Sequence, residues 1–329
     1  MVGLLEPLEV KGLLLKNRIV MPPMYSGLAG FDGVVTDEVI KHYVQRSKAL
    51  GLLVVEHTFV VVAGKMAERQ LGIYDNRLIA GLEGLSSRVH ATGTPVVIQL
   101  NHAGRRANKE LTSIDPVAPS ANETARELRG EEIEDLIDAF SMAAERAMKA
   151  GFDGVEVHGA HGFLINQFFS PLTNQRRDRY GGSLENRMRF PLEVVERVVE
   201  KVKGRLLLYR LGADDLDLAR IQLEDSKKLA VKLEEVGVDI IDVSGGLCGS
   251  RARAAQLQGK QGFFVHQAQR IKKVVNGPII GVGGIREPEY ADSLIREGMV
   301  DLVAVGRALL EDSEWAVKAV RKLEAAHSE

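Results

Sequence analysis

Two histidines stand three residues apart near the middle of the 329-residue chain, in the segment HGAHGFLINQFFSPLTNQRRDRYGGSLENR, residues 158–187. Two imidazoles can bind a metal ion, or they can donate hydrogen bonds to one oxygen on which negative charge develops. Glu156 is near His158 and His161 in the sequence, but no well-placed third metal ligand is evident. We therefore rank a metal site low and expect no metal. The next large side chain, Phe163, has no proton to give.

The backbone decides whether the two histidines can share an oxygen. On a continuing strand, residues three apart lie about 10 Å from each other and on opposite faces. Gly159 and Gly162 permit the chain to leave the strand after His158. In that case both side chains can point to one spot.

Further polar residues interrupt apolar, strand-like segments near their C-terminal ends. Alternation along each segment places them on the face opposite the apolar neighbours, and they are Gln99, Glu156, His158, Arg210 and Asp242. Burying such groups is costly unless ligands or partners satisfy them. A self-contained network of arginine and carboxylates explains Glu156 and Asp242 at least as well as catalysis does. Gln99, His158 and Arg210 together favour a ligand.

Two glycine-containing segments in the last sixth of the chain indicate what that ligand carries. Gly283 and Gly284 follow one apolar run, and Gly306 with Arg307 follows the next and opens a short helix. Glycines let backbone N–H groups approach phosphate oxygens, and arginine adds a charge-assisted fork. Any one of these glycines could simply make a tight turn, but together with Arg307 they predict a phosphate site.

The elements that must position these residues form eight repeats of a strand followed by a helix. Strands are expected at 18–24, 51–60, 95–102, 153–158, 205–211, 238–244, 278–283 and 300–305, and helices at 36–50, 79–92, 130–150, 184–203, 222–236, 264–275, 287–297 and 312–325. No change of composition divides the chain. The sequence therefore predicts an α/β fold, a single (β/α)8 TIM barrel over residues 1–329, in which loops after the seventh and eighth strands commonly bind phosphate.

The competing architecture is a doubly wound open sheet with a dinucleotide-binding motif. Its support is Gly281, Gly283 and Gly284 before a helix, with Asp301 about 20 residues later. That motif lacks the third glycine and falls in the seventh repeat. We therefore favour the barrel.

Composition excludes several classes of function. Lys and Arg number 43 and Asp and Glu 45, so the net charge of −2 predicts no binding to nucleic acid or to an anionic membrane. The single cysteine, Cys248, excludes an internal disulfide and a thiolate-bound metal or iron–sulfur cluster held by this chain alone. The N-terminal segment lacks the features of a signal peptide, and no run of about 18 apolar residues could span a bilayer. We expect a cytoplasmic protein.

Five segments in order, NRIVMPPM, QLNHAGRRA, the histidine segment, GVGGI and VGRALL, resemble the old yellow enzyme family of flavin oxidoreductases. The nearest likeness is to its bacterial branch, which includes the FMN domain of 2,4-dienoyl-CoA reductase. The resemblance implies noncovalent FMN across the mouth of one FMN-binding barrel, reduced by NADH or NADPH. It also implies an ene-reductase, in which hydride passes from flavin N5 to the β-carbon of an activated alkene such as an α,β-unsaturated carbonyl.

The family's site residues carry over by position. The resemblance implies that Pro22, Pro23 and Met24 run beside the isoalloxazine and that Gln99 contacts its pyrimidine edge. It places Arg210 by flavin N1 and O2. It also implies that the phosphate is held by Gly283, Gly284, Gly306 and Arg307. A fixed cation near N1 favours the reduced, anionic flavin. His158 and His161 would bind the substrate carbonyl oxygen. His57 stands where the family has a small residue, and the resemblance gives it no role.

Phe163 departs from the family, which commonly has a tyrosine that protonates the α-carbon at this position. A general acid contributes roughly 10²–10⁴-fold, so we expect either another donor or a reaction that needs none there. Tyr25, at the end of the first strand, is one candidate donor and water is the other. Nitro-group reduction, desaturation in reverse, and oxidation of a C–N bond, as in a dehydrogenase or demethylase, need no acid there. Tyr25 and Phe163 are expected to line the substrate site with the two histidines.

The source of electrons has two alternatives. The dienoyl-CoA reductase branch adds an iron–sulfur segment and further nucleotide domains, whereas this chain ends near the barrel and has one cysteine. Electrons therefore come directly from NADH or NADPH, or from a redox partner protein. The chain is either a self-sufficient enzyme for a small-molecule substrate or a flavin-bearing electron-transfer subunit. We expect a homo-oligomer, as is common for such barrels.

Overall fold

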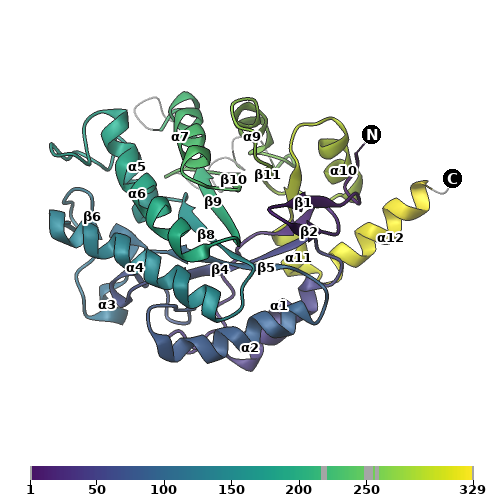
Figure 1. Ribbon diagram of the computed structural model, residues 1–329, viewed down its shortest axis with the longest axis horizontal. Helices are drawn as coiled ribbons and strands as arrows, with labels where there is room; N and C mark the ends of the chain where they lie inside the picture. The colour runs from purple at the N-terminus through teal and green to yellow at the C-terminus, as the bar shows by residue number, and fades with distance from the viewer. Residues whose placement is uncertain (1, 216–220, 248–254, 256–258, 328–329) are drawn as a thin grey trace.

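Eight parallel strands close into a barrel in the computed structural model, which describes residues 2–215, 221–247, 255 and 259–327 (Figure 1). Around the barrel they are β3 (Ile19–Met21), β4 (Leu52–Phe59), β5 (Val96–Asn101), β8 (Gly154–Gly159), β9 (Leu206–Gly212), β10 (Ile240–Ser244), β11 (Ile279–Val282) and β12 (Leu302–Ala304). Pairing of β12 with β3 closes the ring. The predicted (β/α)8 barrel is therefore confirmed, and the open doubly wound sheet is wrong.

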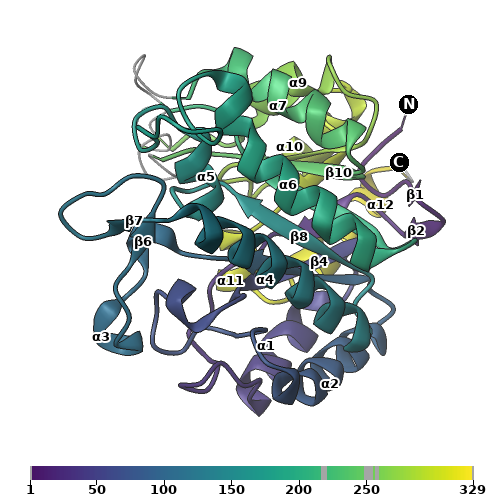
Figure 2. The ribbon, with the colours of Figure 1, turned by 60° about the vertical axis from the view of Figure 1, so that its left-hand side comes forward.

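A long helix follows each barrel strand, and together these helices surround the barrel (Figures 1 and 2). They are α1 (Asp37–Ser47), α2 (Ile79–His90), α4 (Gly130–Lys149), α6 (Leu184–Val202), α7 (Leu223–Glu235), α9 (Val265–Lys272), α10 (Pro288–Arg296) and α12 (Trp315–His327). Their starts follow local signals in the sequence. Thr36 caps α1 by accepting the Val39 backbone N–H, and Pro288 opens α10 where no intrahelical donor is needed.

The barrel interior is apolar at one end and polar at the other. One cluster of buried side chains fills the apolar end, at the N-terminal ends of the strands. Its members are Val10, Leu15, Val20, Leu52, Val54, Val97, Leu206, Leu208, Ile240, Ile280, Leu302 and Ala304. Val10 and Leu15 come from an antiparallel hairpin, β1 (Leu8–Val10) and β2 (Leu13–Leu15), that plugs this end of the barrel. The hairpin was not predicted from the sequence. The polar residues lie at the opposite end of the barrel, at the C-terminal ends of the strands.

Short elements occupy the loops at the open end. They are α3 (Lys109–Thr112), α5 (Leu164–Phe169), α11 (Arg307–Glu311), the strand pair β6 (Val117–Ala118) and β7 (Arg126–Glu127), and the 3₁₀ turns η1 (Val62–Gly64), η2 (Asn76–Leu78) and η3 (Gly104–Arg106). The short helix predicted to open at Arg307 is α11. Figure 2 shows β6 and β7 projecting beside α5, so the two long loops after β5 and β8 lie side by side.

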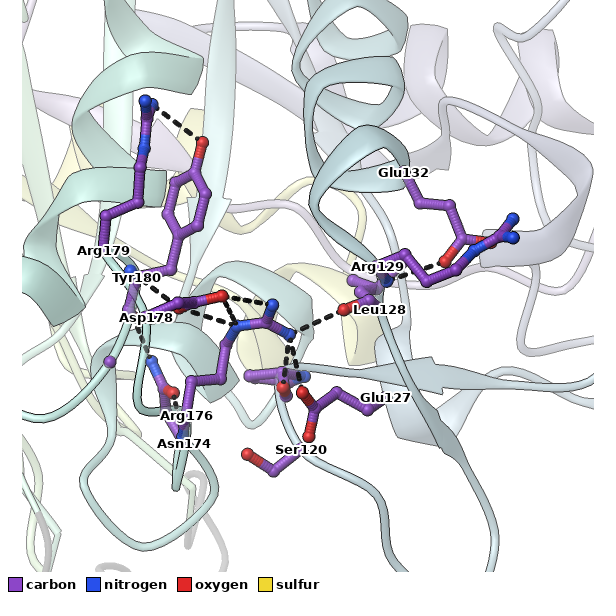
Figure 3. A network of polar contacts seen from close by, with 12 residues as sticks. Ser120, Glu127, Leu128, Arg129, Glu132, Asn174, Arg176, Asp178, Arg179 and Tyr180 are labelled. Atoms are coloured by element: carbon purple, nitrogen blue, oxygen red, sulfur yellow. Dashed lines mark hydrogen bonds and ion pairs between the residues drawn. The ribbon is translucent and has the colours of Figure 1, made fainter.

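Arg176, in the tail of the histidine segment, ties these two loops together (Figure 3). Its Nη1 donates to the carbonyl oxygens of Pro119 and Leu128 at 2.9 and 2.7 Å, both in the loop after β5. Its Nη2 pairs with Asp178 at 2.6 Å within its own loop. The Arg176 side chain is buried, so its guanidinium supplies hydrogen-bond donors to backbone carbonyl oxygens that the irregular loops would otherwise leave without a partner. The basic tail of the segment is thus a brace for the loop that carries His161.

Among the described residues, no helix is both long and apolar enough to cross a membrane. Within the same residues, no group of three or more His, Cys, Asp or Glu side chains is arranged to hold a metal ion. Cys248, on which the expected absence of disulfides and clusters depends, lies outside the described residues.

Candidate active site

A cavity opens at the C-terminal ends of the barrel strands. Its wall consists of Pro22, Pro23, Met24, His161, Arg210, Ser244, Phe263, Phe264, Val282, Gly283, Gly284, Gly306 and Arg307. The structure therefore brings together the residues predicted to hold a cofactor, with the exception of Gln99. Gln99 is buried in the barrel interior and does not line the cavity.

Glycines form a part of the wall where side chains would not fit. Gly283 and Gly284 have φ angles of 134° and 66°, a region that favours glycine. A Cβ on Gly284 would lie 2.9 Å from Arg307 Nη2, and one on Gly306 would lie 3.0 Å from Met24 Sδ. Backbone groups and the Arg307 cation thus share one open corner of the cavity. This corner fits the phosphate of FMN, which needs close N–H donors and a charge-assisted fork.

Polar side chains in the barrel interior form two pairs across neighbouring strands. Gln99 Nε2 donates to Glu156 Oε1 at 2.8 Å, and Arg210 Nε lies 3.3 Å from Asp242 Oδ2. All four side chains are buried. Gln99 Oε1, Glu156 Oε2 and Asp242 Oδ1 have no hydrogen-bond partner among the described residues. The self-contained network is therefore incomplete, and its remaining atoms are available to a ligand or to ordered water.

Burial shifts the pKa of both carboxyl groups of this network. Burial raises the pKa of Glu156 to about 8, Asp242 adds to the shift, and Arg210 opposes it. Burial also raises the pKa of Asp242, and Arg210 again opposes the shift. Glu156 is therefore mostly protonated at neutral pH. Arg210 lines the cavity, and a fixed cation there suits a reduced, anionic flavin.

The chain leaves β8 after Gly159, and this departure brings the two histidines together. His161 has a φ of 58°, and its ring centroid lies 5.1 Å from that of His158, with the rings nearly perpendicular. Ser244 Oγ lies 2.7 Å from His161 Nε2, and the His161 backbone N–H donates to Gly245 O. His158 is almost wholly buried, and its Nδ1 has no hydrogen-bond partner among the described residues. The two rings are thus close enough to face one ligand.

Both imidazoles are neutral. Burial lowers the pKa of His158 and of His161 well below the ordinary value, and the cations Arg210 and Arg106 lower them further. A neutral imidazole carries one N–H donor. The pair can therefore donate to an oxygen without first losing or gaining a proton.

Phe163 and Tyr25 lie beside the histidine pair and meet through a third histidine. The ring centroid of Phe163 is 4.8 Å from that of His158, and the Arg106 guanidinium lies 5.0 Å from the Phe163 ring. His57 stacks on Tyr25, with centroids 5.6 Å apart, and contacts Phe163 at 5.5 Å. Tyr25 is 43% exposed and Phe163 is buried. All four predicted substrate residues therefore belong to one continuous group of rings.

A β-bulge in β4 places His57 in this group. The register of β4 with β5 shifts between Val55 and Thr58, so Glu56 and His57 together oppose one residue of β5. Glu56 turns towards α1, where the Tyr43 hydroxyl lies 3.3 Å from its carboxyl, and His57 turns towards Tyr25. Sequence alternation alone could not predict which residue is the extra one.

Some residues of the site were not predicted. Phe263 and Phe264 line the cavity, and Arg106 lies over Phe163. The signal for the first two is a pair of aromatic residues between a glycine and helix α9, in the segment GFFVHQ. Arg106 lies within the segment QLNHAGRRA, but the presence of an arginine there did not predict that its side chain would lie over Phe163.

Comparison with known proteins identifies the family. Residues 3–326 match the family described as the NADH:flavin oxidoreductase / NADH oxidase family. The chain is 44% identical over 322 residues to an NADH oxidase of Thermoanaerobacter brockii, which covers 94% of this chain and 50% of that protein. It is 40% identical over 326 residues to an NADPH dehydrogenase of Bacillus licheniformis, covering 97% of this chain and 94% of the relative. The chain thus spans about half the length of the first relative and nearly all of the second.

The fold of this chain is also that of a solved family member. An old yellow enzyme homologue from Zymomonas mobilis superposes with a TM-score of 0.85 at 27% identity, covering 98% of this chain and 93% of that chain. The family match, the relatives and the glycine corner of the cavity agree with FMN as cofactor and NADH or NADPH as reductant. The chain therefore belongs to the NADH:flavin oxidoreductase / NADH oxidase family, the old yellow enzymes, and is an FMN-dependent NAD(P)H oxidoreductase.

Proposed function

We propose that this enzyme reduces an activated alkene, above all an α,β-unsaturated carbonyl compound. The observation that carries the proposal is the neutral pair of His158 and His161. His161 lines the cofactor cavity with Arg210, and the His158 ring packs against the His161 ring. FMN, when bound, supplies the hydride for the β-carbon. The residues of this chain bind the carbonyl oxygen, exclude water and deliver the proton.

His158 and His161 are the donors for the carbonyl oxygen in this proposal. Their N–H groups stabilise the negative charge that grows on that oxygen as the β-carbon accepts hydride. Both rings are held in place before substrate arrives, His161 by Ser244 and His158 by its burial in β8. Removing one preorganised donor of this kind typically costs about 2.7–4 kcal/mol of transition-state stabilisation.

Tyr25 is the proposed proton donor in place of the tyrosine that Phe163 replaces. Its ring stacks on His57, and His57 contacts Phe163, so Tyr25 belongs to the same group of rings. Burial raises the pKa of Tyr25, and the nearby carboxyl of Glu56 raises it further. The phenol therefore keeps its proton at neutral pH and can act as a general acid.

Phe163 supports a second candidate. Its phenyl ring cannot donate a proton. A reaction that needs no protonation at carbon is therefore as compatible with Phe163 as alkene reduction is. A dehydrogenase or demethylase meets that condition, and a flavin-bearing electron-transfer subunit with a redox partner protein meets it as well. We also propose, from the sequence, a homo-oligomer that works in the cytoplasm.

An anaerobic half-reaction tests the proposal. Enzyme with reduced FMN is mixed with cyclohexenone, and reoxidation of the flavin and formation of cyclohexanone are followed. The wild type should form cyclohexanone, and His158→Ala should lower the rate by roughly 10²–10³-fold. His266→Ala, which changes an exposed histidine on α9, is the matched control. A reduced flavin that cyclohexenone does not reoxidise would favour the second candidate.

A further inference from the structure

His57 has a fixed tautomer, and Gln70 sets it. Gln70 is fully buried between β4 and α2. Its Oε1 accepts the Met66 backbone N–H at 2.9 Å, and its Nε2 donates to the His57 carbonyl oxygen at 3.2 Å. Reversing the amide would place oxygen against the carbonyl and NH₂ against the N–H, so these two backbone groups fix its orientation. The amide NH₂ is therefore the group that faces the imidazole.

This orientation leaves the proton of the imidazole on the other nitrogen. Gln70 Nε2 lies 2.8 Å from His57 Nδ1, which must accept. Burial lowers the pKa of His57 to about 4, with Arg106 and Arg210 adding to the shift, so the ring is neutral. A neutral imidazole that accepts at Nδ1 carries its proton at Nε2. No hydrogen bond among the described residues uses Nε2, and the residue is partly exposed.

Gln70 also completes the bulge that brings His57 to the site. In the bulge, the Glu56 N–H donates to the Tyr43 hydroxyl at 2.8 Å, and the His57 carbonyl oxygen accepts from Gln70 Nε2 at 3.2 Å. Both backbone groups freed by the irregularity are thus satisfied by buried side chains. Such a bulge re-aims a side chain. The ring it re-aims contacts Tyr25 and Phe163.

We propose that the Nε2–H of His57 forms a second polar subsite, which binds a hydrogen-bond acceptor at the far end of the substrate from the oxygen held by His158 and His161. The Phe163 ring contacts both His158 and His57, at 4.8 and 5.5 Å, so an apolar surface joins the two polar positions. The ligand class is a planar conjugated compound with an acceptor oxygen at each end. The subsite rests on the proposed function, because it presumes the histidine pair as the first anchor.

Two para-substituted phenols test the subsite in the FMN-bound enzyme, and each Kd is expressed for the ionised phenol so that the different acidities of the two compounds do not enter the comparison. para-Hydroxybenzaldehyde carries an acceptor oxygen opposite its hydroxyl, whereas para-(trifluoromethyl)phenol does not. Both should give a long-wavelength charge-transfer band, from which each Kd is obtained. We expect the wild type to bind the aldehyde roughly three- to tenfold more tightly, the range of one net hydrogen bond.

Two variants separate His57 from its neighbour. His57→Phe keeps a ring against Tyr25 and Phe163 but removes the donor, so the preference for the aldehyde should fall to about one. The affinity for the trifluoromethyl compound should hold, which shows that the site is intact. Tyr25→Phe removes the nearby hydroxyl and should keep the preference.

The outcomes distinguish the subsite from the function. A preference that survives His57→Phe, or that disappears in Tyr25→Phe alone, would overturn the subsite. Equal binding of the two phenols by the wild type would do the same and leave the proposed function standing. If neither phenol gives a charge-transfer band, the histidine pair is not the anchor, and both proposals are wrong.

Discussion

The imidazole of His161 lies edge to face against that of His158, with ring centroids 5.1 Å apart, although only His158 belongs to a strand. His161 occupies the turn after β8, where its φ of 58° is unusual for any residue but glycine. A continuing strand would place the two side chains on opposite faces. The turn therefore makes a donor pair from a spacing that a strand would separate, and the Arg176 brace holds the loop in which the turn lies.

Replacing Phe163 by tyrosine should accelerate alkene reduction if only the acid is missing. The gain should fall between about tenfold and several thousandfold, given the roughly 10²–10⁴ contribution of a general acid and a site that is imperfectly prepared for it. Stopped-flow measurement of flavin reoxidation by cyclohexenone detects it, while reduction by NADPH should hardly change. If Tyr25 already supplies the proton, the gain will be small and Tyr25→Phe will slow the wild type. Unchanged, low rates in both variants would point away from alkene reduction.

Removing the side chain of Arg307 should weaken binding of FMN but not of riboflavin. The guanidinium lies at the glycine corner of the cavity, where we propose that it binds the phosphate of FMN. A hydrogen bond to a charged group is worth roughly 1.5–3 kcal/mol, so Arg307→Ala should raise the Kd of FMN by about tenfold to a hundredfold. Fluorescence titration of the apoprotein measures both ligands, and Arg286→Ala, an exposed arginine, is the control. Equal losses for FMN and riboflavin would place the phosphate elsewhere.

The barrel could be predicted from the sequence because each strand and helix carries its own periodicity. Eight alternating segments, with glycines and polar residues at the ends of the strands, determine both the closed sheet and the position of the cavity. The N-terminal hairpin could not be predicted, because each of its strands has only three residues in a segment of mixed apolar and charged residues. The bulge at His57 was missed for a different reason. Alternation assumes one residue per position, whereas the extra residue is set by tertiary contacts with Tyr43 and Gln70.

Arg176→Ala should destabilise the fold and disturb the histidine turn. The change leaves the buried carbonyl oxygens of Pro119 and Leu128 without this donor, and an unsatisfied buried acceptor costs about 1–3 kcal/mol. A lower midpoint in chemical unfolding and weaker phenol binding are the expected results. Arg177→Ala changes the exposed neighbour in the same segment and should affect neither. Normal stability in Arg176→Ala would show that the two loops are held by other contacts.

Titration of the Glu56 carboxyl should lower the free energy of unfolding as the pH rises. Burial raises its pKa from the ordinary 4.5 to about 7, although hydrogen bonds from Ser26 oppose the shift. The folded state therefore holds a proton that the unfolded chain has lost, and this stabilisation is full below about pH 4.5 and is lost as the pH rises through about 7.

Glu56→Gln isolates this contribution. Between pH 4.5 and pH 8 the wild type should lose up to roughly 3 kcal/mol of unfolding free energy relative to the variant, since one pKa unit corresponds to about 1.4 kcal/mol. The buried histidines act in the opposite direction at lower pH but are common to both proteins. Urea unfolding across the pH range gives the difference, and parallel curves for the two proteins would show that Glu56 does not titrate there.

We propose that this chain takes electrons from NADH or NADPH by itself and passes them to an activated alkene. Anaerobic mixing of the FMN-bound protein with each nucleotide, followed by cyclohexenone, follows both transfers in one experiment. At least one nucleotide should bleach the flavin absorbance within seconds, and cyclohexenone should restore it, as expected for an enzyme with an ordinary turnover rate of about 1–10³ s⁻¹. A flavin that stays oxidised with both nucleotides, yet is reduced by dithionite, would instead identify a subunit that depends on a partner.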